Sequence, residues 1–468
     1  MKRAFTRISA VVLFAGLAMA GSAMAVPPKD ADVDEFVKAV STSGEGIKPE
    51  DRAAVMAARN KAIEEGIAKL SMAEATFEQI DKVLTSVGWT SRKVVDAVLP
   101  RIEEIAKEKT AAGAKAAAYQ MVMVPPAAMV QGDTKANAEA TKARAEKVAG
   151  MFAALLKHPG LGEALKTGIN ATALSTGMRM PMATMMSSGV LALVEPVLEM
   201  EMTAEAASAF SSVIDAVAGA TEGVDSATRG RMLDKASAMC EKASGKVDMT
   251  KPNAKNMQDR LKAQAKKANG PFARGTLIGG MAPEVKFTWS SDGKLKSLAD
   301  LKGKVVVVDF WATWCGPCIS SFPKVRDLVE RYNGYDVAVV GVTSVQGFHI
   351  ERKDGEKTSN RIDCKDDVAK ETGLMPVFIK DMKMTWPVVF SEDSCFNPMF
   401  GVNGIPHVAI IDPSGKVRYN GLHPMDEGKL EKIDGLLKEF NLKAPAAEAK
   451  KEEPKKEEAK PEKKDDKK

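Results

Sequence analysis

One stretch of the sequence, a run of mostly apolar residues followed by two cysteines, restricts the fold most. Residues 305–310 read Val-Val-Val-Val-Asp-Phe, and the sequence Cys315-Gly316-Pro317-Cys318 follows after a four-residue gap. A continuous apolar run of this kind predicts a central strand that is buried on both faces. Proline fixes φ and suits the first turn of a helix, so we expect a helix to begin at the cysteines. A strand, a cysteine pair and a helix in this order indicate an α/β domain.

The two cysteines are spaced for reversible disulfide chemistry. At a helix N-terminus, unpaired backbone N–H groups and the helix dipole would favour a thiolate at Cys315. Cys318 lies within the same turn, so the two can form a small disulfide. We expect Cys315 to attack a partner disulfide and Cys318 to resolve the mixed disulfide. The alternatives are a static disulfide or half of a zinc site, but the sequence has no second cysteine pair or histidine cluster to complete one.

Further strands and helices alternate on either side of the cysteines. Apolar runs predict strands at 337–342 and 407–411, and the turn Asp412-Pro413-Ser414-Gly415 leads to a strand at 416–419 that makes a hairpin. Helical patterns fall at 317–332, 365–383 and 426–440. Strands that alternate with helices and end in a hairpin and a helix predict a compact α/β domain over residues 283–443.

The preceding residues, 26–270, carry a different pattern. They are rich in Ala, Met, Lys and Glu, and their apolar residues recur at helical spacing, as at Phe77, Ile80, Val83, Leu84 and Val87. We therefore expect an all-α domain of eight to ten helices without a fixed repeat. Gly270-Pro271 and Gly279-Gly280 break the helical pattern, which predicts a linker at 271–282.

The two ends of the chain read as a targeting segment and a tail. Residues 1–25 combine a positive start, a short apolar stretch and the site Ala23-Met24-Ala25, the pattern of a cleavable signal peptide. We expect export to a bacterial periplasm, with an uncleaved membrane anchor as the alternative. Residues 444–468 are almost entirely Lys, Glu, Asp, Ala and Pro, and we expect them to be disordered.

Charge and cysteine content exclude two classes of protein. The 67 basic and 62 acidic residues nearly balance to a net charge of +5, which argues against a nucleic-acid partner. Five cysteines in 468 residues exclude a disulfide-rich scaffold.

The motifs together resemble the TlpA/ResA-type thiol-disulfide oxidoreductases, which are exported proteins of the thioredoxin fold. The resemblance covers residues 281–443, about a third of the chain. Its matching text is Met281-Ala282-Pro283-Glu284, Asp292-Gly293-Lys294, residues 297–304, residues 305–318, Gly404-Ile405-Pro406, Ile410-Ile411-Asp412 and Gly415-Lys416-Val417. It implies an α/β thioredoxin-like domain, with a central mixed sheet flanked by helices, behind the all-α domain.

The resemblance also assigns roles to single residues. It implies that Cys315 attacks, that Cys318 resolves, and that Asp309 is the buried acid that assists deprotonation of Cys318. Pro406 resembles the cis-proline that faces the disulfide and pairs its neighbouring backbone with the substrate. The residues around these positions are predicted to contact the substrate: Trp314, Gly316, Pro317 and Ile405. No cofactor and no metal are implied.

Several positions depart from the family pattern. His407 follows the proline where thioredoxins usually have Thr, and it could contact substrate, tune Cys315 or simply be packed and neutral. Residues 344–361 read as a polar, flexible insertion. Cys364 and Cys395 could form a structural disulfide or remain buried thiols, and Cys240 has no evident partner.

We therefore expect an exported enzyme that reduces protein disulfides. The Gly-Pro dipeptide matches the reducing thioredoxins, whose potential is about −270 mV. Such a protein needs a membrane thiol electron donor and a disulfide-containing client, for example in cytochrome c maturation. The helical domain could bind the client or self-associate. A disulfide oxidase or isomerase remains open, whereas the CxxC pair argues against a peroxidase of the peroxiredoxin type.

A cluster of methionines supports a second hypothesis of another class, a metal-binding scaffold. The cluster comprises Met178, Met180, Met182, Met185 and Met186. Thioethers select Cu(I), so a copper site is conceivable. Methionine also packs well in helix cores, and the whole region is rich in it.

Overall fold

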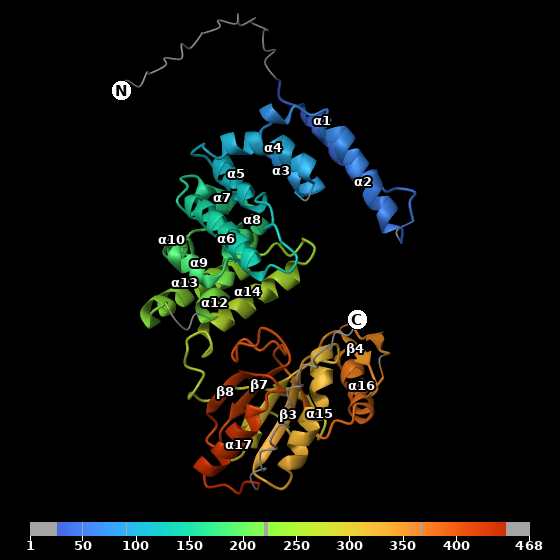
Figure 1. The fold of residues 1–468 in the computed structure, drawn as a ribbon, viewed down its shortest axis with the longest axis vertical. Helices are drawn as coiled ribbons and strands as arrows, with labels where there is room; N and C mark the ends of the chain where they lie inside the picture. Colours follow the sequence, from blue (N-terminus) through green and yellow to red (C-terminus); the bar gives the residue numbers. More distant parts are fainter. Residues whose placement is uncertain are drawn as a thin grey trace, which may run out of the picture. The chain divides into compact units, whose positions relative to one another are not determined.

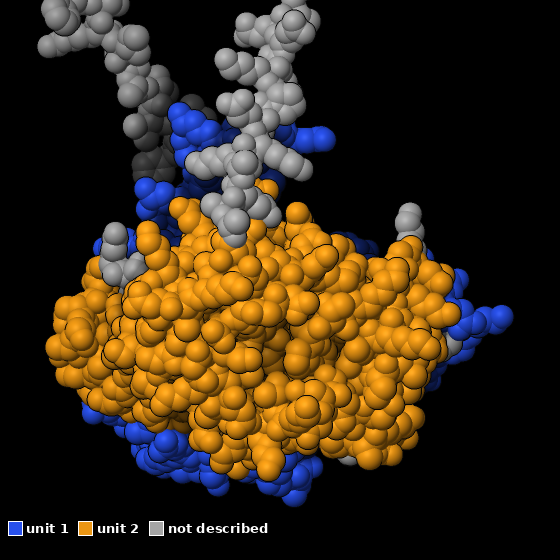
Figure 2. Space-filling model, turned by 90° about the horizontal axis from the view of Figure 1, so that it is seen from below, with its two compact units in different colours: residues 1–213, 238–261 blue, residues 214–237, 262–468 orange. Residues whose placement is uncertain are grey.

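The computed structural model describes residues 26–445 except 49, 90, 220–222, 357 and 366. The predicted signal peptide lies outside these residues, as does nearly all of the predicted tail. The chain divides into two compact units, one of residues 1–213 and 238–261 and the other of residues 214–237 and 262–468 (Figure 2). The second unit thus includes short helical stretches from before the predicted linker at 271–282, and the domain limits drawn from the sequence stay a prediction.

The region before residue 270 is helical, as the apolar spacing predicts. Its elements are α1 (Asp30–Thr42), α2 (Arg52–Ile67), a 3₁₀ turn (Met72–Glu74), α3 (Phe77–Val87), α4 (Arg92–Ile105), α5 (Ala111–Val122), α6 (Thr134–Leu156), α7 (Leu161–Thr167), α8 (Ala171–Met178), α9 (Met182–Ser187), α10 (Val190–Val197), α11 (Ala204–Phe210), α12 (Ser212–Gly219), α13 (Ser226–Ser244) and α14 (Ala254–Asn269) (Figure 1). There are more helices in this described region than the eight to ten expected, because several span only six or seven residues.

The first helices pack around a core made by their apolar stripes. All five residues of the predicted stripe on α3 are buried, from Phe77 to Val87, and Ile80 and Val83 have no exposed surface. Thr76 caps this helix, accepting a hydrogen bond from the backbone N–H of Gln79, whose side chain accepts one in return from the N–H of Thr76. Burial of the stripe therefore explains why this segment is helical.

The second unit contains a six-stranded mixed sheet in the order β1-β6-β3-β2-β7-β8. Strands β2, β3 and β6 run parallel, while β7, β8 and β1 are antiparallel to their neighbours. The elements are β1 (Phe287–Ser290), a 3₁₀ turn (Leu298–Leu301), β2 (Val305–Phe310), α15 (Gly316–Arg331), β3 (Val337–Thr343), β4 (Phe348–Glu351), β5 (Asn360–Asp363), α16 (Val368–Asp381), β6 (Val388–Ser391), β7 (His407–Ile411), β8 (Val417–Leu422) and α17 (Gly428–Glu439). The predicted fold class, an α/β thioredoxin-like domain preceded by a helical region, is confirmed.

Strand β2 lies in the middle of the sheet and is fully buried. Its residues alternate between two cores, as side chains in a strand must. Val305 and Val307 pack with residues of α15, α16 and α17, whereas Val306, Val308 and Phe310 join a second core on the other face. Asp309 shares the strand face of Val305 and Val307, which is also the face of α15.

The segment after β3 is more ordered than the sequence suggests. We expected a polar, flexible insertion at 344–361, but β4 and β5 within and beside it pair as an antiparallel hairpin. His349 on β4 is buried and meets the ring of Phe378 edge to face. The contact between His349 and Phe378 packs the hairpin against α16, although the surrounding sequence is polar.

Within the part of the chain that the structure describes, every helix is too short or too polar to cross a membrane.

Candidate active site

The two motif cysteines lie at the N-terminus of α15 and are joined by a disulfide. Their Cα atoms are 5.3 Å apart. Cys315 is the N-cap residue, and its Sγ accepts a hydrogen bond of 3.2 Å from the backbone N–H of Cys318. Gly316 and Pro317 form the first turn, where proline loses no helical hydrogen bond. Once the disulfide is reduced, the same N–H and the helix dipole would stabilise a thiolate on Cys315.

The loop before β7 faces the disulfide. The peptide bond between Ile405 and Pro406 is cis, as the resemblance implies. The carbonyl oxygen of Ile405 lies 3.6 Å from the Sγ of Cys315. The structure therefore brings together predicted residues that are about ninety positions apart in the chain.

His407, the first residue of β7, is held by its own domain. Its Nε2 lies 2.9 Å from the Oδ1 of Asn420, and its ring meets Phe310 edge to face. Burial lowers the pKa of His407, although the hydrogen bond to Asn420 opposes the shift. Of the readings left open by the sequence, these contacts favour a packed, neutral histidine.

Asp309 is a buried acid that forms no hydrogen bond with the described part of the chain. The residue is 2% exposed, and neither carboxylate oxygen has a partner among the described groups. Because burial disfavours the charged form, the pKa of Asp309 is raised to about 8. Such a group exchanges its proton near neutral pH, which suits an acid or base in thiol chemistry.

Lys429, at the start of α17, is the cation that acts on Asp309. Its charge opposes the rise in the pKa of Asp309, without cancelling it. The ammonium group is itself buried and donates hydrogen bonds to the backbone carbonyls of Pro424 and Asp426. Burial lowers the pKa of Lys429 in turn. Lys429 was not predicted as part of the site, because a lysine in an amphipathic helix normally faces solvent.

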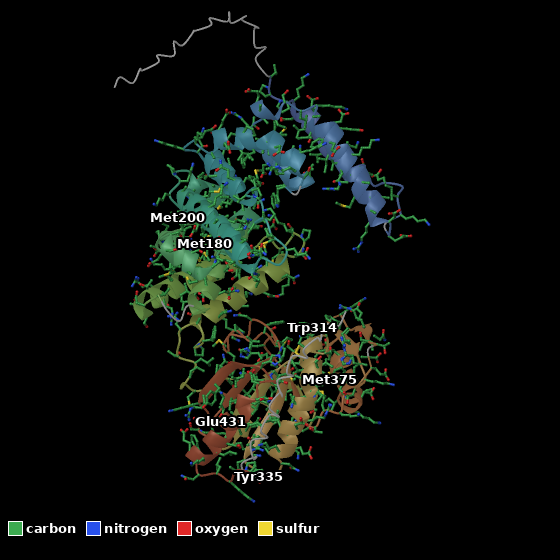
Figure 3. All side chains as sticks on the ribbon, in the orientation of Figure 1. Met180, Met200, Trp314, Tyr335, Met375 and Glu431 are labelled. Carbon is green, nitrogen blue, oxygen red and sulfur yellow. A yellow bond between two sulfur atoms is a disulfide. The ribbon has the colours of Figure 1, made fainter. Side chains whose placement is uncertain are left out.

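Trp314 is positioned by two loops that the sequence analysis did not connect with it. Its Nε1 donates a 3.0 Å hydrogen bond to the Oε1 of Gln346, just after β3. Its ring stacks on Phe396, with centroids 6.2 Å apart. Figure 3 labels Trp314 and Tyr335 at opposite ends of the domain. The loops that carry Gln346 and Phe396 therefore meet at the end of the domain where Trp314 and the disulfide lie.

Gln346 is in turn fixed by a buried polar network. Its backbone N–H and that of Gly347 donate to the carboxylate of Glu371 at 2.8 and 2.9 Å. Its Nε2 donates to the backbone oxygen and the hydroxyl of Ser344. Burial raises the pKa of Glu371, while the two N–H groups lower it. Gln346, which accepts the hydrogen bond from Trp314, is thus fixed by Glu371 through its backbone and by Ser344 through its side chain.

Cys240, Cys364 and Cys395 are buried free thiols. Of the two alternatives for Cys364 and Cys395, a structural disulfide or buried thiols, the structure shows buried thiols. Burial raises the pKa of both, and it raises that of Cys240 to about 12. All three are therefore poor nucleophiles in the folded protein.

The methionine cluster is largely part of a core. Met178, Met180 and Met185 are buried, and Met182 and Met186 are half-buried. Packing explains these side chains without a ligand. No group of three or more His, Cys, Asp or Glu side chains in the described chain could hold a metal ion.

Comparisons with known proteins agree with this site. Residues 278–437 match the Redoxin family. The chain is 26% identical over 143 residues to the thiol-disulfide oxidoreductase ResA of Oceanobacillus iheyensis, and 28% identical over 127 residues to ResA of Bacillus subtilis. These matches cover 30% and 27% of this chain and 62% and 58% of the two relatives, so the chain spans about three fifths of their length.

Solved structures are similar over the same part of the chain. The exposed lipoprotein thioredoxin of Streptococcus pneumoniae is 24% identical, with a TM-score of 0.24, over 33% of this chain and 98% of that chain. A thiol:disulfide interchange protein from a Bacteroides species is 22% identical, with a TM-score of 0.24, over 35% and 90%. By sequence, residues 278–437 are thus similar to the Redoxin family and to the ResA-type thiol-disulfide oxidoreductases.

Proposed function

We propose that this protein is an exported thiol-disulfide oxidoreductase that reduces disulfides in client proteins. The observation that carries the proposal is the Cys315–Cys318 disulfide at the N-terminus of α15, next to the carbonyl of Ile405. A helix N-terminus favours a thiolate, and a backbone carbonyl beside it can pair with a client chain. The Redoxin match and the ResA relatives support the same activity.

The reaction proceeds in two exchanges from the reduced protein. The thiolate of Cys315 attacks one sulfur of the client disulfide, a new S–S bond forms, and the other client sulfur leaves as a thiolate that takes up a proton. Cys318 then loses its proton and attacks the Sγ of Cys315. The protein disulfide forms and the second client thiol leaves. Two electrons pass from the protein dithiol to the client disulfide.

Asp309 serves the second exchange. It is a buried carboxyl on the α15 face of β2, and its pKa of about 8 lets it accept a proton near neutral pH. We assign it as the base that takes the proton of Cys318. Lys429, as its buried cationic neighbour, keeps part of the carboxyl ionised in that pH range.

The direction and the compartment rest on the sequence. The Gly316-Pro317 dipeptide between the cysteines is that of reducing thioredoxins. Residues 1–25 have the pattern of a secretory signal, and an oxidising compartment would require a membrane thiol donor to keep the cysteines reduced. The resemblance to TlpA/ResA proteins supports clients of the cytochrome c maturation type.

Trapping of client disulfides tests the activity. Cys318→Ser should accumulate mixed disulfides with clients, because without the resolving thiol the covalent intermediate cannot collapse. Cys315→Ser should accumulate none and should not reduce disulfides. Non-reducing gels of both variants, with and without dithiothreitol, show the adducts. Adducts on the Cys315 variant instead of the Cys318 variant would reverse the two roles.

The redox potential of the cysteine pair tests the direction. A value near that of thioredoxin, about −270 mV, agrees with a reductase. A value above about −150 mV, closer to that of DsbA, would make the protein an oxidase. Equilibration with glutathione buffers, followed by alkylation of the free thiols, gives this number.

A further inference from the structure

A groove lies between helix α14 and the loop that joins β6 to β7, within the second unit. Its volume is about 490 Å³. One wall is the C-terminal half of α14, with Lys262, Gln264 and Lys266. The other is formed by residues of the loop, including Phe396 and Pro398.

Two lysines of α14 fix the walls of this groove to each other. Lys266 forms an ion pair of 2.6 Å with Asp393 of the loop. The side chain of Lys267 is only 7% exposed, and its Nζ lies 2.6 Å from a carboxylate oxygen of Asp215 and 2.7 Å from the Oδ1 of Asn403. Because a buried ammonium is costly unless it is paired, these contacts hold helix and loop together. The shape of the groove is therefore maintained by specific ion pairs and hydrogen bonds within the second unit.

The groove and the redox site share one loop. Phe396 lines the groove and also stacks on Trp314, the residue before Cys315. Asn403 lines the groove two residues before Ile405, whose carbonyl oxygen faces the Sγ of Cys315. The groove and the cysteine pair are therefore linked through the loop that joins β6 to β7.

The chemistry of the groove suits an extended polypeptide. Phe396 remains 38% exposed although it is a large apolar side chain, and Pro398 beside it adds apolar surface. On the opposite wall the Oε1 of Gln264 is buried, and no described group donates a hydrogen bond to it. A buried acceptor without a partner is destabilising. Rotation of the Gln264 side chain toward the groove would let a backbone N–H of a bound chain donate to this oxygen.

The charges of the groove favour an acidic partner. Lys266 and Lys267 are neutralised by Asp393 and Asp215. Lys262 is exposed and forms no ion pair with any residue that the structure describes. The groove therefore presents one uncompensated positive charge beside an apolar wall.

We propose that this groove binds the segment of a client protein that flanks the client's reactive cysteine, and that it prefers a segment with apolar and acidic residues. This inference rests on the proposed function, since it names the substrate class of the same site. The apolar side chain packs on Phe396, a backbone N–H donates to Gln264, and a carboxylate pairs with Lys262.

Two short peptides of equal length test the preference. Each carries one cysteine in a mixed disulfide with thionitrobenzoate, flanked by Phe and Asp in the acidic peptide and by Phe and Lys in the basic one. The reduced full-length protein attacks the peptide sulfur and releases thionitrobenzoate, which is followed by its absorbance. We expect the acidic peptide to react about two- to fivefold faster, the range for one exposed ion pair. The difference should shrink in about 1 M salt, where the Debye length is about 3 Å.

Matched variants locate the preference in the groove. Lys262→Glu should abolish or reverse it, and Gln264→Met should slow both peptides alike. Lys438→Glu makes the same change of charge at an exposed position of α17 outside the groove, and it should leave the preference intact. All three variants should react with the small disulfide dithiobis(nitrobenzoate) at the wild-type rate, because it does not reach the groove.

The outcomes separate the two proposals. If the wild-type protein reacts with neither the small disulfide nor the peptides, the proposed function fails. If it reacts with both peptides at equal rates, the docking groove is refuted while the function stands. The same refutation follows if Lys262→Glu and Lys438→Glu change the ratio of rates equally.

Discussion

At the scale of single residues, the site depends on two buried ionisable side chains, Asp309 on β2 and Lys429 at the start of α17. Asp309 could be identified from the sequence, because an acid inside a run of valines is costly without a role. Lys429 could not be identified in this way, because a helical pattern of residues does not tell which lysine of the helix is buried against the sheet. The same holds for Gln346 and Phe396, which reach Trp314 from loops distant in sequence. The sequence motifs thus predicted the cysteines and the buried acid, whereas only the fold shows which residues surround them.

The first prediction concerns the rate of the resolving step. Asp309→Asn should slow the attack of Cys318 on the mixed disulfide about 10²-fold or more, the usual contribution of a positioned base. It should leave the first attack by Cys315 nearly unchanged. In the wild type the resolving rate should rise with pH through about 8, as Asp309 loses its proton, and this rise should be absent in the variant. Stopped-flow measurements of Trp314 fluorescence follow both steps.

A wild-type resolving rate in Asp309→Asn from about pH 6 to pH 8 would contradict this role, since the base form of a group with a pKa near 8 increases across that range. Asp309 would then be a packing residue only.

The same residue makes stability depend on pH. An unfolded aspartate ionises near pH 3.9, whereas the folded group ionises near 8, so the folded state loses stability as pH rises between these values. Asp309→Asn should therefore be more stable than the wild type at about pH 9, by several kcal/mol because each pH unit between the two pKa values corresponds to about 1.4 kcal/mol, and similar to it at about pH 4. Urea unfolding of the oxidised protein at both pH values measures the difference. Asp336→Asn, at an exposed position, should show no such pH-dependent gain.

At the scale of elements, the long strands were predictable and the short ones were not. The apolar runs predicted β2 and β7 at the limits that the structure shows, and the two strands pair antiparallel with Asp309 opposite Val408. Strands β1 and β6 have four residues each, and β6 directly follows Pro387, so neither forms a distinctive pattern. The β4–β5 hairpin was missed because its residues are largely polar and exposed.

Close packing on β3 predicts an effect of a single methyl group. Gly341 lies opposite Asp309 in the sheet, and a Cβ there would lie 2.9 Å from the Nε1 atoms of both Trp311 and Trp386. Gly341→Ala should lower the free energy of unfolding by about 1–3 kcal/mol, the usual effect of overpacking. Urea unfolding again provides the measurement.

The matched control for this change is Gly435→Ala in α17. A Cβ at this position meets no atom within 4 Å, and alanine suits a helix interior better than glycine. This variant should gain about 0.5–1 kcal/mol. A neutral or stabilising Gly341→Ala would show that the two tryptophans can move apart.

At the scale of the whole molecule, the redox chemistry should be separable from client selection. All groups assigned to thiol exchange lie between Asp309 and Lys429, whereas Lys262 and Gln264 of the groove precede residue 270. The helical class of the first part was predictable from apolar spacing. The function of these helices was not predictable, because contacts such as that of Lys267 with Asn403 join residues 136 positions apart in the sequence.

A fragment of residues 276–443 tests this separation. It should fold, because it contains the six-stranded sheet and its helices, and it should reduce dithiobis(nitrobenzoate) at about the full-length rate. It should lose the preference for acidic peptides, since it lacks α14. An insoluble or inactive fragment would show that the preceding helices complete the redox fold.

The burial of Cys240, Cys364 and Cys395 has a consequence for the fidelity of disulfide pairing. A client held on Cys315 can be released by any thiolate that reaches that sulfur, and an unfolded chain would no longer protect its other cysteines from taking part. Correct pairing thus comes from exclusion, because the three competitors are protected inside the fold. Partial unfolding should allow this protein to scramble its own cysteines, so its conformational stability sets the accuracy of the proposed thiol exchange.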